Sequence, residues 1–416
     1  REENLALVRW LLARKVDPNK ADSKGASPMY LAKQGGLAEL IHMIEKAGGT
    51  TTLLSPVLWA SSITEKENKA IYGFASGPLI VGNLVVIGHE DGYLYAFDRS
   101  NGTLRWKRHL GGEIRHSPRL MDGDLFVTAD SHTLTRIRPA DGSIVWQFAY
   151  SGTQVAGGAQ FWRNLVLVAD FNGNLRAVDR STGKLYWERS MGRMSSVVRD
   201  EDGLRIVGDG AYFLNKQGLS RFDLVSGKFS RYSVKDAGMP EVADGLAFVP
   251  TKGKELHVLD AITLQPKQKV MLGAEALVRP LLHNSRLIVS IEGGLQAFRV
   301  RPALLRKIGF KPLGKLAWQR ETSIESYARP VIGKYWLTVY TLEPENEHKP
   351  GETSILNLVN LLMLDPETGK EHAKVALWES YLYGDKVVTP AVDGNVVYAA
   401  PLGPSKRLQA VKVGLW

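Results

Sequence analysis

Short runs of apolar residues alternate with polar turns along most of the chain. Between residues 77 and 106, four such runs cover 79–81, 84–88, 93–97 and 103–106. Gly82-Asn83, Asp91-Gly92 and Asn101-Gly102 separate them. Asn-Gly and Asp-Gly tolerate positive φ and favour tight turns between antiparallel strands. The pattern therefore predicts four short antiparallel strands, which is the content of one β-propeller blade.

This unit repeats along the chain. Six prolines stand at the start of a first strand, Pro78, Pro118, Pro240, Pro280, Pro330 and Pro390, and Ala159 and Ser196 take that place in two further units. The eight starts lie 37 to 60 residues apart. Self-similarity at this period is the signature of a repeat architecture. We therefore expect a mainly β protein whose residues 51–416 form an eight-bladed β-propeller.

The last unit is incomplete. After a third strand at 408–413 it has no residues for a fourth strand, whereas segment 53–59 precedes the first unit and belongs to no blade. We expect this N-terminal segment to supply the missing strand of blade eight. Pairing of the N- and C-terminal strands would close the ring and remove an exposed sheet edge.

A Gly-x-x-x-Trp pattern marks the fourth strands. It occurs as Gly102/Trp106, Gly142/Trp146, Gly183/Trp187 and Gly314/Trp318, and it decays to Gly227/Arg231 and Gly369/Ala373. The fifth unit has Leu264-Gln265-Pro266 instead of the glycine. Segments 91–106 and 172–187 closely resemble the pyrroloquinoline-quinone (PQQ)-type, or quinoprotein-type, propeller repeat. The resemblance implies that the tryptophans are structural wedges between blades, namely Trp59, Trp106, Trp146, Trp187 and Trp318.

The first 50 residues follow another pattern. Leu5, Val8, Leu11 and Leu12 recur at helical spacing. The run Gly25-Ala26-Ser27-Pro28-Met29-Tyr30-Leu31-Ala32 and the apolar segment 37–41 resemble an ankyrin repeat. Ser27 can cap a helix that has Pro28 at its first position. We expect residues 1–50 to be a short α-helical, ankyrin-like segment beside the propeller.

Composition narrows the chemistry. The 416 residues include no Cys, which excludes disulfides, thiolate zinc sites and Cys nucleophiles. The formal net charge is +10, which allows an anionic partner. The basic residues are spread along the chain, so nucleic acid or another polyanion is the less favoured partner. The sequence has no apolar run long enough for a transmembrane helix.

Arginines precede several first strands, where a propeller would gather them on one face. We call this the top face: it carries the loops that lead into each first strand and the turns between second and third strands. The candidate partner-binding residues there are Arg115, His116, Arg193, Arg279 and Arg329. They would form a basic funnel that accepts an acidic partner loop or an anionic ligand. The alternative is a set of scattered, locally paired surface residues.

Two insertions depart from the repeat. Residues 343–352 are acidic, with Glu343, Glu345 and Glu347, and they expand a second-to-third-strand turn of blade seven on the top face. Residues 299–313 expand a third-to-fourth-strand link of blade six on the opposite face. There apolar and basic residues alternate, with Leu304, Leu305, Arg306, Lys307 and Phe310 as candidate partner-binding residues. Either insertion could be a docking segment or a tolerated loop that folds on its own blade.

Signatures of catalysis are poor. The nine histidines form no HExxH or HxH pattern, and no phosphate-binding glycine loop is present. We therefore assign no catalytic, cofactor-binding or metal-binding residue, and we expect no cofactor. The resemblance to quinoprotein dehydrogenases keeps a ligand-binding or catalytic quinoprotein as an alternative. Those enzymes have longer chains, a calcium-bound quinone and an adjacent-Cys disulfide that this chain cannot form.

The chain is similar in length, blade number and lack of enzymatic parts to another group of propellers. These are the BamB-type lipoproteins of the outer-membrane β-barrel assembly machinery. The resemblance implies a non-enzymatic scaffold for other proteins of a multi-subunit cell-envelope complex. It also implies a periplasmic or envelope-associated location in a bacterium. The ankyrin-like segment is not part of that family, so we expect a scaffold that serves another assembly.

Overall fold

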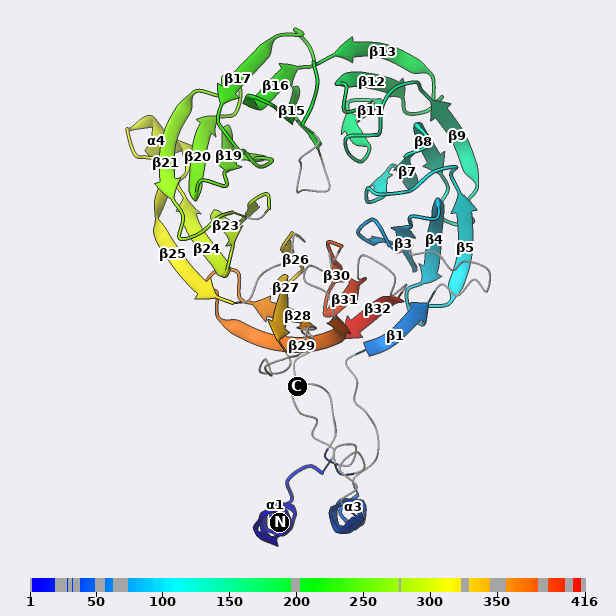
Figure 1. The fold of residues 1–416 in the computed structure, drawn as a ribbon, viewed down its shortest axis with the longest axis vertical. Coiled ribbons are helices and arrows are strands. Elements are labelled where there is room, and N and C mark those ends of the chain that lie inside the picture. Colours follow the sequence, from blue (N-terminus) through cyan, green and yellow to red (C-terminus); the bar gives the residue numbers. More distant parts are fainter. Residues whose placement is uncertain are drawn as a thin grey trace, which may run out of the picture.

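A computed structural model gives the arrangement of the chain. The structure describes residues 2–18, 28, 32, 38–48, 57–62, 74–195, 203–276, 278–322, 329–344, 357–380, 388–400 and 407–412. Within these residues, eight four-stranded antiparallel sheets stand around a ring. Figure 1 shows them as blades that follow one another in chain order around the ring, whose central axis we call the channel. The prediction of a mainly β, eight-bladed propeller is confirmed.

Each blade has its first strand at the channel and its fourth strand at the outer rim. Blade one is β2 (Leu79–Val81), β3 (Leu84–Gly88), β4 (Tyr93–Asp98) and β5 (Leu104–His109), and blade two is β6 (Arg119–Met121), β7 (Asp124–Ala129), β8 (Thr133–Ile137) and β9 (Ile144–Ala149). Blade three is β10 (Gln160–Trp162), β11 (Leu165–Ala169), β12 (Asn174–Asp179) and β13 (Leu185–Ser190), and blade four is β14 (Leu204–Val207), β15 (Gly210–Asn215), β16 (Gly218–Asp223) and β17 (Phe229–Ser233).

The second half of the ring continues this order. Blade five is β18 (Glu241–Ala243), β19 (Leu246–Pro250), β20 (Glu255–Asp260) and β21 (Pro266–Met271), and blade six is β22 (Leu281–His283), β23 (Arg286–Ile291), β24 (Gly294–Val300) and β25 (Leu313–Glu321). Blade seven is β26 (Val331–Ile332), β27 (Leu337–Pro344), β28 (Asn357–Leu364) and β29 (Glu371–Ser380), and blade eight is β30 (Ala391–Asp393), β31 (Val396–Ala399), β32 (Arg407–Lys412) and β1 (Val57–Ser62).

Blade eight is built from both ends of the propeller sequence. Strand β1 pairs antiparallel with β32, with Ala60 opposite Gln409 and Ser62 opposite Arg407. The sheet order is β1-β32-β31-β30, so β1 is the outermost strand of this blade. In Figure 1 the blue β1 lies beside the red β32 at the bottom of the ring.

Apolar contacts between neighbouring sheets form the core. Blades one and two, for example, share a cluster with Val86, Leu94 and Ala96 on one side and Leu125 and Val127 on the other. Such side chains are fully buried because each blade covers the face of the next. In the fourth strand β5, exposed and half-buried positions largely alternate, since only one face of the strand meets a neighbour.

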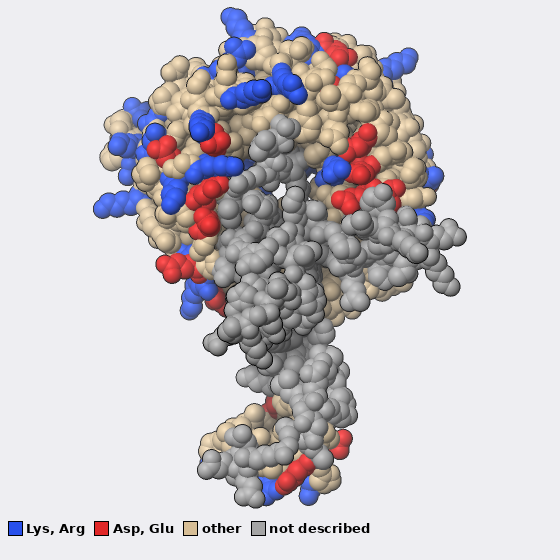
Figure 2. Space-filling view, viewed as in Figure 1, with Lys and Arg blue, Asp and Glu red and all other residues tan. Residues whose placement is uncertain are grey.

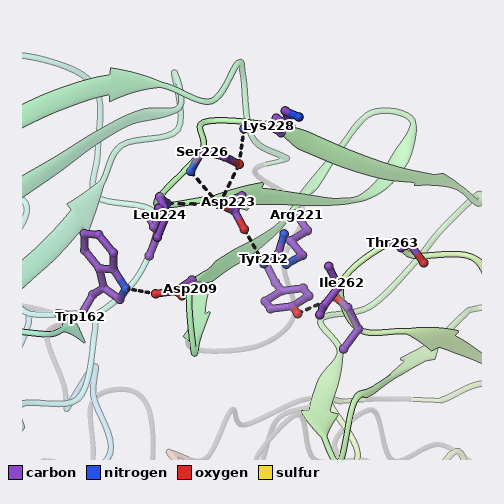
Figure 3. A network of polar contacts seen from close by, with 12 residues as sticks. Trp162, Asp209, Tyr212, Arg221, Asp223, Leu224, Ser226, Lys228, Ile262 and Thr263 are labelled. Carbon is purple, nitrogen blue, oxygen red and sulfur yellow. Dashed lines mark hydrogen bonds and ion pairs between the residues drawn. The ribbon is translucent and has the colours of Figure 1, made fainter.

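A recurring aspartate organises the turn between the third and fourth strands. In blade four, Asp223 Oδ1 accepts hydrogen bonds from the backbone N–H of Ser226 at 2.8 Å and from the Ser226 hydroxyl at 2.8 Å (Figure 3). Arg221 Nη2 donates to Asp223 Oδ2 at 2.9 Å. These bonds favour the charged carboxylate and lower the pKa of Asp223 to about 2. Asp98, Asp179, Asp260 and Asp365 stand in the equivalent turns of blades one, three, five and seven.

Four of the predicted wedge tryptophans contact a glycine turn of the next blade. A Cβ at Gly142 would meet Trp106 Cε3 at 2.6 Å, and a Cβ at Gly183 would meet Trp146 Cδ2 at 2.7 Å. Trp106 Nε1 also donates to the carbonyl oxygen of Pro139 at 2.7 Å. Trp59 faces Gly102 and Trp318 faces Gly369 in the same manner. Only a glycine at positive φ leaves room for the indole ring at such a turn.

The fifth blade departs from this pairing. Leu264 stands at the glycine position with a φ of +57°, and its N–H donates to the Asp260 carbonyl at 2.9 Å, as a turn glycine would. A leucine in this conformation costs about 1–2 kcal/mol. Its buried side chain packs in a cluster with Tyr212. Because blade four carries Arg231 at the tryptophan position, both members of the wedge pair are replaced together.

The start of blade four differs from the sequence prediction. We placed it at Ser196, which lies outside the described residues, whereas β14 begins at Leu204. The chain still reaches the ring at Met194, whose N–H donates to the Phe171 carbonyl at 3.0 Å, as Ile114 does with His89 in blade two. The loop between Met194 and β14 is therefore longer than the repeat predicts.

Two helices lie outside the ring in Figure 1, α1 (Glu2–Ala13) and α3 (Ala38–Lys46). Arg9 of α1 and Glu39 of α3 form an ion pair at 2.6 Å. Most of the Gly25–Ala32 motif, on which the ankyrin interpretation rests, lies outside the described residues. Two short helices do not support an ankyrin repeat, and that interpretation stays a prediction.

Candidate functional site

The loops leading into the first strands bring charged side chains to the channel. A proline starts most first strands, and the residues just before and after it lie at the top end of the innermost strand. Arg279 and Arg329 precede Pro280 and Pro330, while Arg119 and Glu241 follow Pro118 and Pro240. Three of these residues, Arg119, Arg279 and Arg329, line one cavity, which marks the channel mouth.

Three arginines from three blades meet one carboxylate. Arg205 of β14 contacts Glu241 through both terminal nitrogens, each at 3.1 Å from a carboxylate oxygen. Arg329 Nη2 lies 3.0 Å from Glu241 Oε2, and Arg279 Nε lies 3.9 Å from the same oxygen. Only 10% of the Glu241 side chain is exposed, and only 8% of the Arg279 side chain. Three guanidinium groups around one carboxylate leave an excess of positive charge in a partly desolvated place.

This charge borders a cavity at the channel mouth. The cavity has a volume of about 390 Å³ and is shared by blades one, two, six, seven and eight. Its charged lining residues are Arg119, Arg279 and Arg329, and its described lining includes no Asp or Glu. The volume falls within the range of ligand sites in proteins. A carboxylate or phosphate is the chemical group that this lining would favour, because guanidinium groups bind such anions in forked geometry.

A second cavity adjoins the first. It has a volume of about 230 Å³ and lies among the top-face turns of blades four, five and six. Lys216, Lys252 and Asp236 line it, and Arg279 lines both cavities. The two cavities thus share a buried guanidinium, which makes Arg279 the central residue of the candidate site.

The structure brings together two of the five predicted top-face residues, Arg279 and Arg329. Arg115 forms ion pairs with Glu113 and with Asp130, the latter at 2.8 Å. Partial burial would lower the pKa of Arg115, but these carboxylates outweigh it and raise the pKa. His116 is half-buried, and Arg193 is exposed; neither lines either cavity.

The predicted insertions are described to different extents. Glu343 is in strand β27, and nothing is described of its side chain, while Glu345 and Glu347 lie outside the described residues. In the other insertion, α4 (Ala303–Lys307) projects from the rim of blade six. Leu304, Leu305 and Phe310 are exposed there. Arg306 and Lys307 line a cavity against blade five.

Sequence reasoning missed three members of the site, Arg119, Arg205 and Glu241. Arg119 and Glu241 stand one residue after Pro118 and Pro240, so aligning the blade starts at that position would have found them. Arg205 was not predicted to belong to the site, because blade four was expected to begin at Ser196. Within the described residues, no group of three or more His, Asp or Glu side chains could hold a metal ion. No described helix has the length and apolar character needed to cross a bilayer.

Part of the chain is similar in sequence to known proteins. Residues 47–235 match the profile of a family described as outer membrane protein assembly factor BamB. The BamB of Moranella endobia is 24% identical over 234 residues, which cover 53% of this chain and 60% of that protein. The chain thus matches less than two thirds of the length of that relative.

Other relatives share the repeat. The dehydrogenase subunit of a quinone-dependent alcohol dehydrogenase from Acetobacter aceti is 27% identical over 171 residues, which cover 36% of this chain and 21% of that subunit. Among solved structures, the computationally designed Ika8 protein aligns with a TM-score of 0.58 at 11% identity, over 86% of this chain and 99% of that one. The likeness to Ika8 concerns the fold alone. The chain is therefore an eight-bladed β-propeller whose first half is similar in sequence to BamB outer-membrane assembly factors.

Proposed function

We propose that the protein is a non-enzymatic scaffold for protein–protein interactions in a bacterial cell-envelope assembly, and that an acidic segment of a partner binds at the channel mouth. The observation that carries the proposal is the cavity lined by Arg119, Arg279 and Arg329. The similarity to outer-membrane assembly factors supports the envelope setting and a periplasmic or envelope-associated location.

Contacts within the site hold two of the arginines in place. Glu241 fixes Arg205 and Arg329 at 3.0–3.1 Å from its carboxylate, and Arg329 Nη2 also donates to the Pro280 carbonyl at 3.2 Å. Little side-chain entropy would be lost when a partner carboxylate binds to groups that are already held in place. Preorganised cations also steer an acidic partner toward the channel mouth.

Co-purification from native membranes tests the scaffold proposal. Tagged wild-type protein is compared with Arg119→Gln/Arg279→Gln, which leaves the Arg205–Glu241–Arg329 contacts intact. The matched control is Arg105→Gln/Arg163→Gln, because those side chains are 60% and 61% exposed and line neither channel cavity. We expect the wild type and the control to retain the same envelope proteins, and the channel variant to retain about tenfold less. Equal retention by all three folded proteins contradicts the proposal.

A quinoprotein-type ligand-binding or dehydrogenase function is the second candidate, favoured by the quinone-dependent relative. The described residues of the channel do not fit a quinone held on calcium. The cavity lining supplies guanidinium groups, which do not bind calcium. The nearby Glu241 carboxylate already faces three arginines. Quinone absorbance in the purified protein would favour this candidate over the scaffold. Steeply salt-dependent binding of nucleic acid would instead favour a polyanion-binding protein.

The proposal also covers how the parts of the chain are arranged. We infer that residues 51–416 act as one domain whose ring is held closed by the β1–β32 pair. Residues 1–50 would then form a separate helical segment that offers partners a second docking surface. The acidic insertion that contains Glu343, Glu345 and Glu347 would be a further contact on the top face.

A further inference from the structure

The link between β24 and β25 forms a projecting element on the opposite face of the ring from the channel site. We call residues 301–312, which include helix α4, the rim insertion. The links between third and fourth strands in other blades are tight turns, whereas this one extends over the neighbouring blade five. In Figure 1, α4 stands out beyond the outer edge of the ring near β21.

Hydrogen bonds hold the rim insertion in place. Its two ends are joined by the bond from the Arg301 N–H to the Pro312 carbonyl at 2.8 Å. Arg306 Nη2 donates to the Asp244 carbonyl of blade five at 2.9 Å. At its base, the Leu313 N–H donates to Gln268 Oε1 at 2.8 Å. The insertion is therefore a shaped element fixed to two blades.

This fixed element directs apolar side chains into solvent. Leu304 is 73% exposed, Ile308 67%, Phe310 51% and Leu305 37%. Leu304 and Ile308 are four residues apart, so they lie on the same side of the helical turn. Scattered exposed apolar residues are ordinary on a protein surface, whereas four of them within the seven residues 304–310 are typical of an interaction site.

Basic side chains outnumber acidic ones around the rim insertion. Segment 299–315 contains no Asp or Glu and has six basic residues, Arg299, Arg301, Arg306, Lys307, Lys311 and Lys315. The acidic residues nearby, Asp244 and Asp260, line the cavity beneath the insertion, and Asp260 is paired with Lys267 at 3.3 Å. Figure 2 shows Lys and Arg side chains along this edge of the ring, with Asp and Glu side chains between them.

We propose that the rim insertion binds the surface of an anionic lipid bilayer. A convex tip with exposed apolar side chains and surrounding cations fits the interface, where apolar groups enter the acyl boundary and cations meet lipid phosphates. A protein partner would require a complementary concave surface, whereas a bilayer requires only a protruding tip of this chemistry. The side chains that enter the bilayer are Leu304, Ile308 and Phe310, and Arg301, Lys307 and Lys311 contact the headgroups.

Vesicle flotation tests this proposal with the full chain. The vesicles contain phosphatidylcholine alone or mixed with phosphatidylglycerol. Wild-type protein should float with the anionic vesicles at low salt and much less with the neutral ones. Leu304→Ser/Ile308→Ser should weaken the partition by about tenfold. Arg301→Gln/Lys307→Gln/Lys311→Gln should weaken it by about 100-fold, because each cation near an anionic bilayer contributes about 1 kcal/mol.

Matched controls separate this surface from general stickiness and from the channel site. Tyr186→Ser/Met271→Ser removes side chains that are 71% and 65% exposed elsewhere on the ring, and it should float like the wild type. Arg119→Gln/Arg279→Gln should also float like the wild type, so the scaffold proposal can fail without affecting this one. Absence of wild-type flotation with anionic vesicles at low salt overturns the proposal. Unchanged flotation of the Leu304→Ser/Ile308→Ser variant also overturns it.

Discussion

The indole ring of Trp59 lies over Gly102, and this contact joins the first strand of the propeller to blade one. A Cβ on Gly102 would lie 2.7 Å from Trp59 Cδ2. Trp59 Nε1 donates to the Arg99 carbonyl at 2.9 Å. Since β1 belongs to the sheet of blade eight, the contact spans the junction where the two ends of the propeller sequence meet.

Alanine at Gly102 should weaken this junction. The matched control is Gly227→Ala, because Gly227 occupies the same repeat position at a φ of +72°, close to the +74° of Gly102, but has no atom within 4 Å of a Cβ. In both variants the free energy of unfolding should fall by about 1 kcal/mol, because alanine is strained at positive φ. Gly102→Ala should lose a further 1–3 kcal/mol, roughly, from the clash with the indole ring. Equal denaturant midpoints for the two variants would show that the contact contributes nothing to closure.

The wedge tryptophans should differ in their contribution to stability. Trp106 fills the space over Gly142 and donates to the Pro139 carbonyl, so Trp106→Ala should lower the free energy of unfolding by about 3–5 kcal/mol. Trp187 is only partly buried and packs beside Trp162, while Gly227 of the next blade has open space around it. Trp187→Ala should therefore cost about half as much. Denaturant unfolding of both variants measures the difference, and a larger loss for Trp187→Ala would contradict it.

The turn aspartates should make stability fall in acid. The pKa of Asp223 is about 2 in the folded protein against a usual 3.8, so its contribution is fully present above 3.8 and disappears as the pH falls through about 2. Asp223→Asn should be less stable than the wild type at pH 7, and the gap should narrow below pH 3.8. Asp244→Asn is the control, since asparagine tolerates the φ of +51° there. A gap independent of pH in urea unfolding would contradict the assignment.

Removing the central carboxylate should destabilise the channel mouth. Glu241→Gln deprives Arg205, Arg279 and Arg329 of a shared counter-charge, which should lower the free energy of unfolding by about 3 kcal/mol. Phosphate should restore part of the loss, because an anion can replace the carboxylate. Glu367→Gln is the control, since the Glu367 side chain is 43% exposed and pairs with Arg286 at 3.3 Å. Melting temperatures with and without phosphate measure both effects, and a variant as stable as the control would be the contrary result.

Much of the propeller could be predicted because its turns require particular residues. Glycine at positive φ and tryptophan above it leave a spaced signature that survives in several blades. Blade five shows where this reasoning fails. Leu264 adopts the conformation of the missing glycine, and Gln268 takes the tryptophan position and exchanges hydrogen bonds with Leu313. The surrounding blades impose these local geometries, so the residue types alone do not reveal them.

The candidate site could be predicted only in part. Arg279 and Arg329 were expected at the channel because they precede prolines that start first strands. Their meeting at Glu241 could not be predicted, since the contacts join different blades and Arg329 lies 88 residues from Glu241 in the sequence. Arg205 was missed because the longer loop before β14 displaces blade four from the repeat. Arg115 also precedes a proline that starts a first strand, but it stands three residues before Pro118 and pairs with Asp130 instead.

Site-specific photo-crosslinking from the channel tests the central proposal most directly. A photoreactive residue replaces Thr389, which lines the channel cavity. For comparison, it replaces Leu316, which is 43% exposed on β25. The adducts formed in native cells are mapped by peptide sequencing. The scaffold account predicts that position 389 crosslinks to an acidic segment of an envelope protein, and that Arg119→Gln/Arg279→Gln abolishes this adduct. An adduct that persists at full yield in that variant, or no adduct at 389, would contradict it.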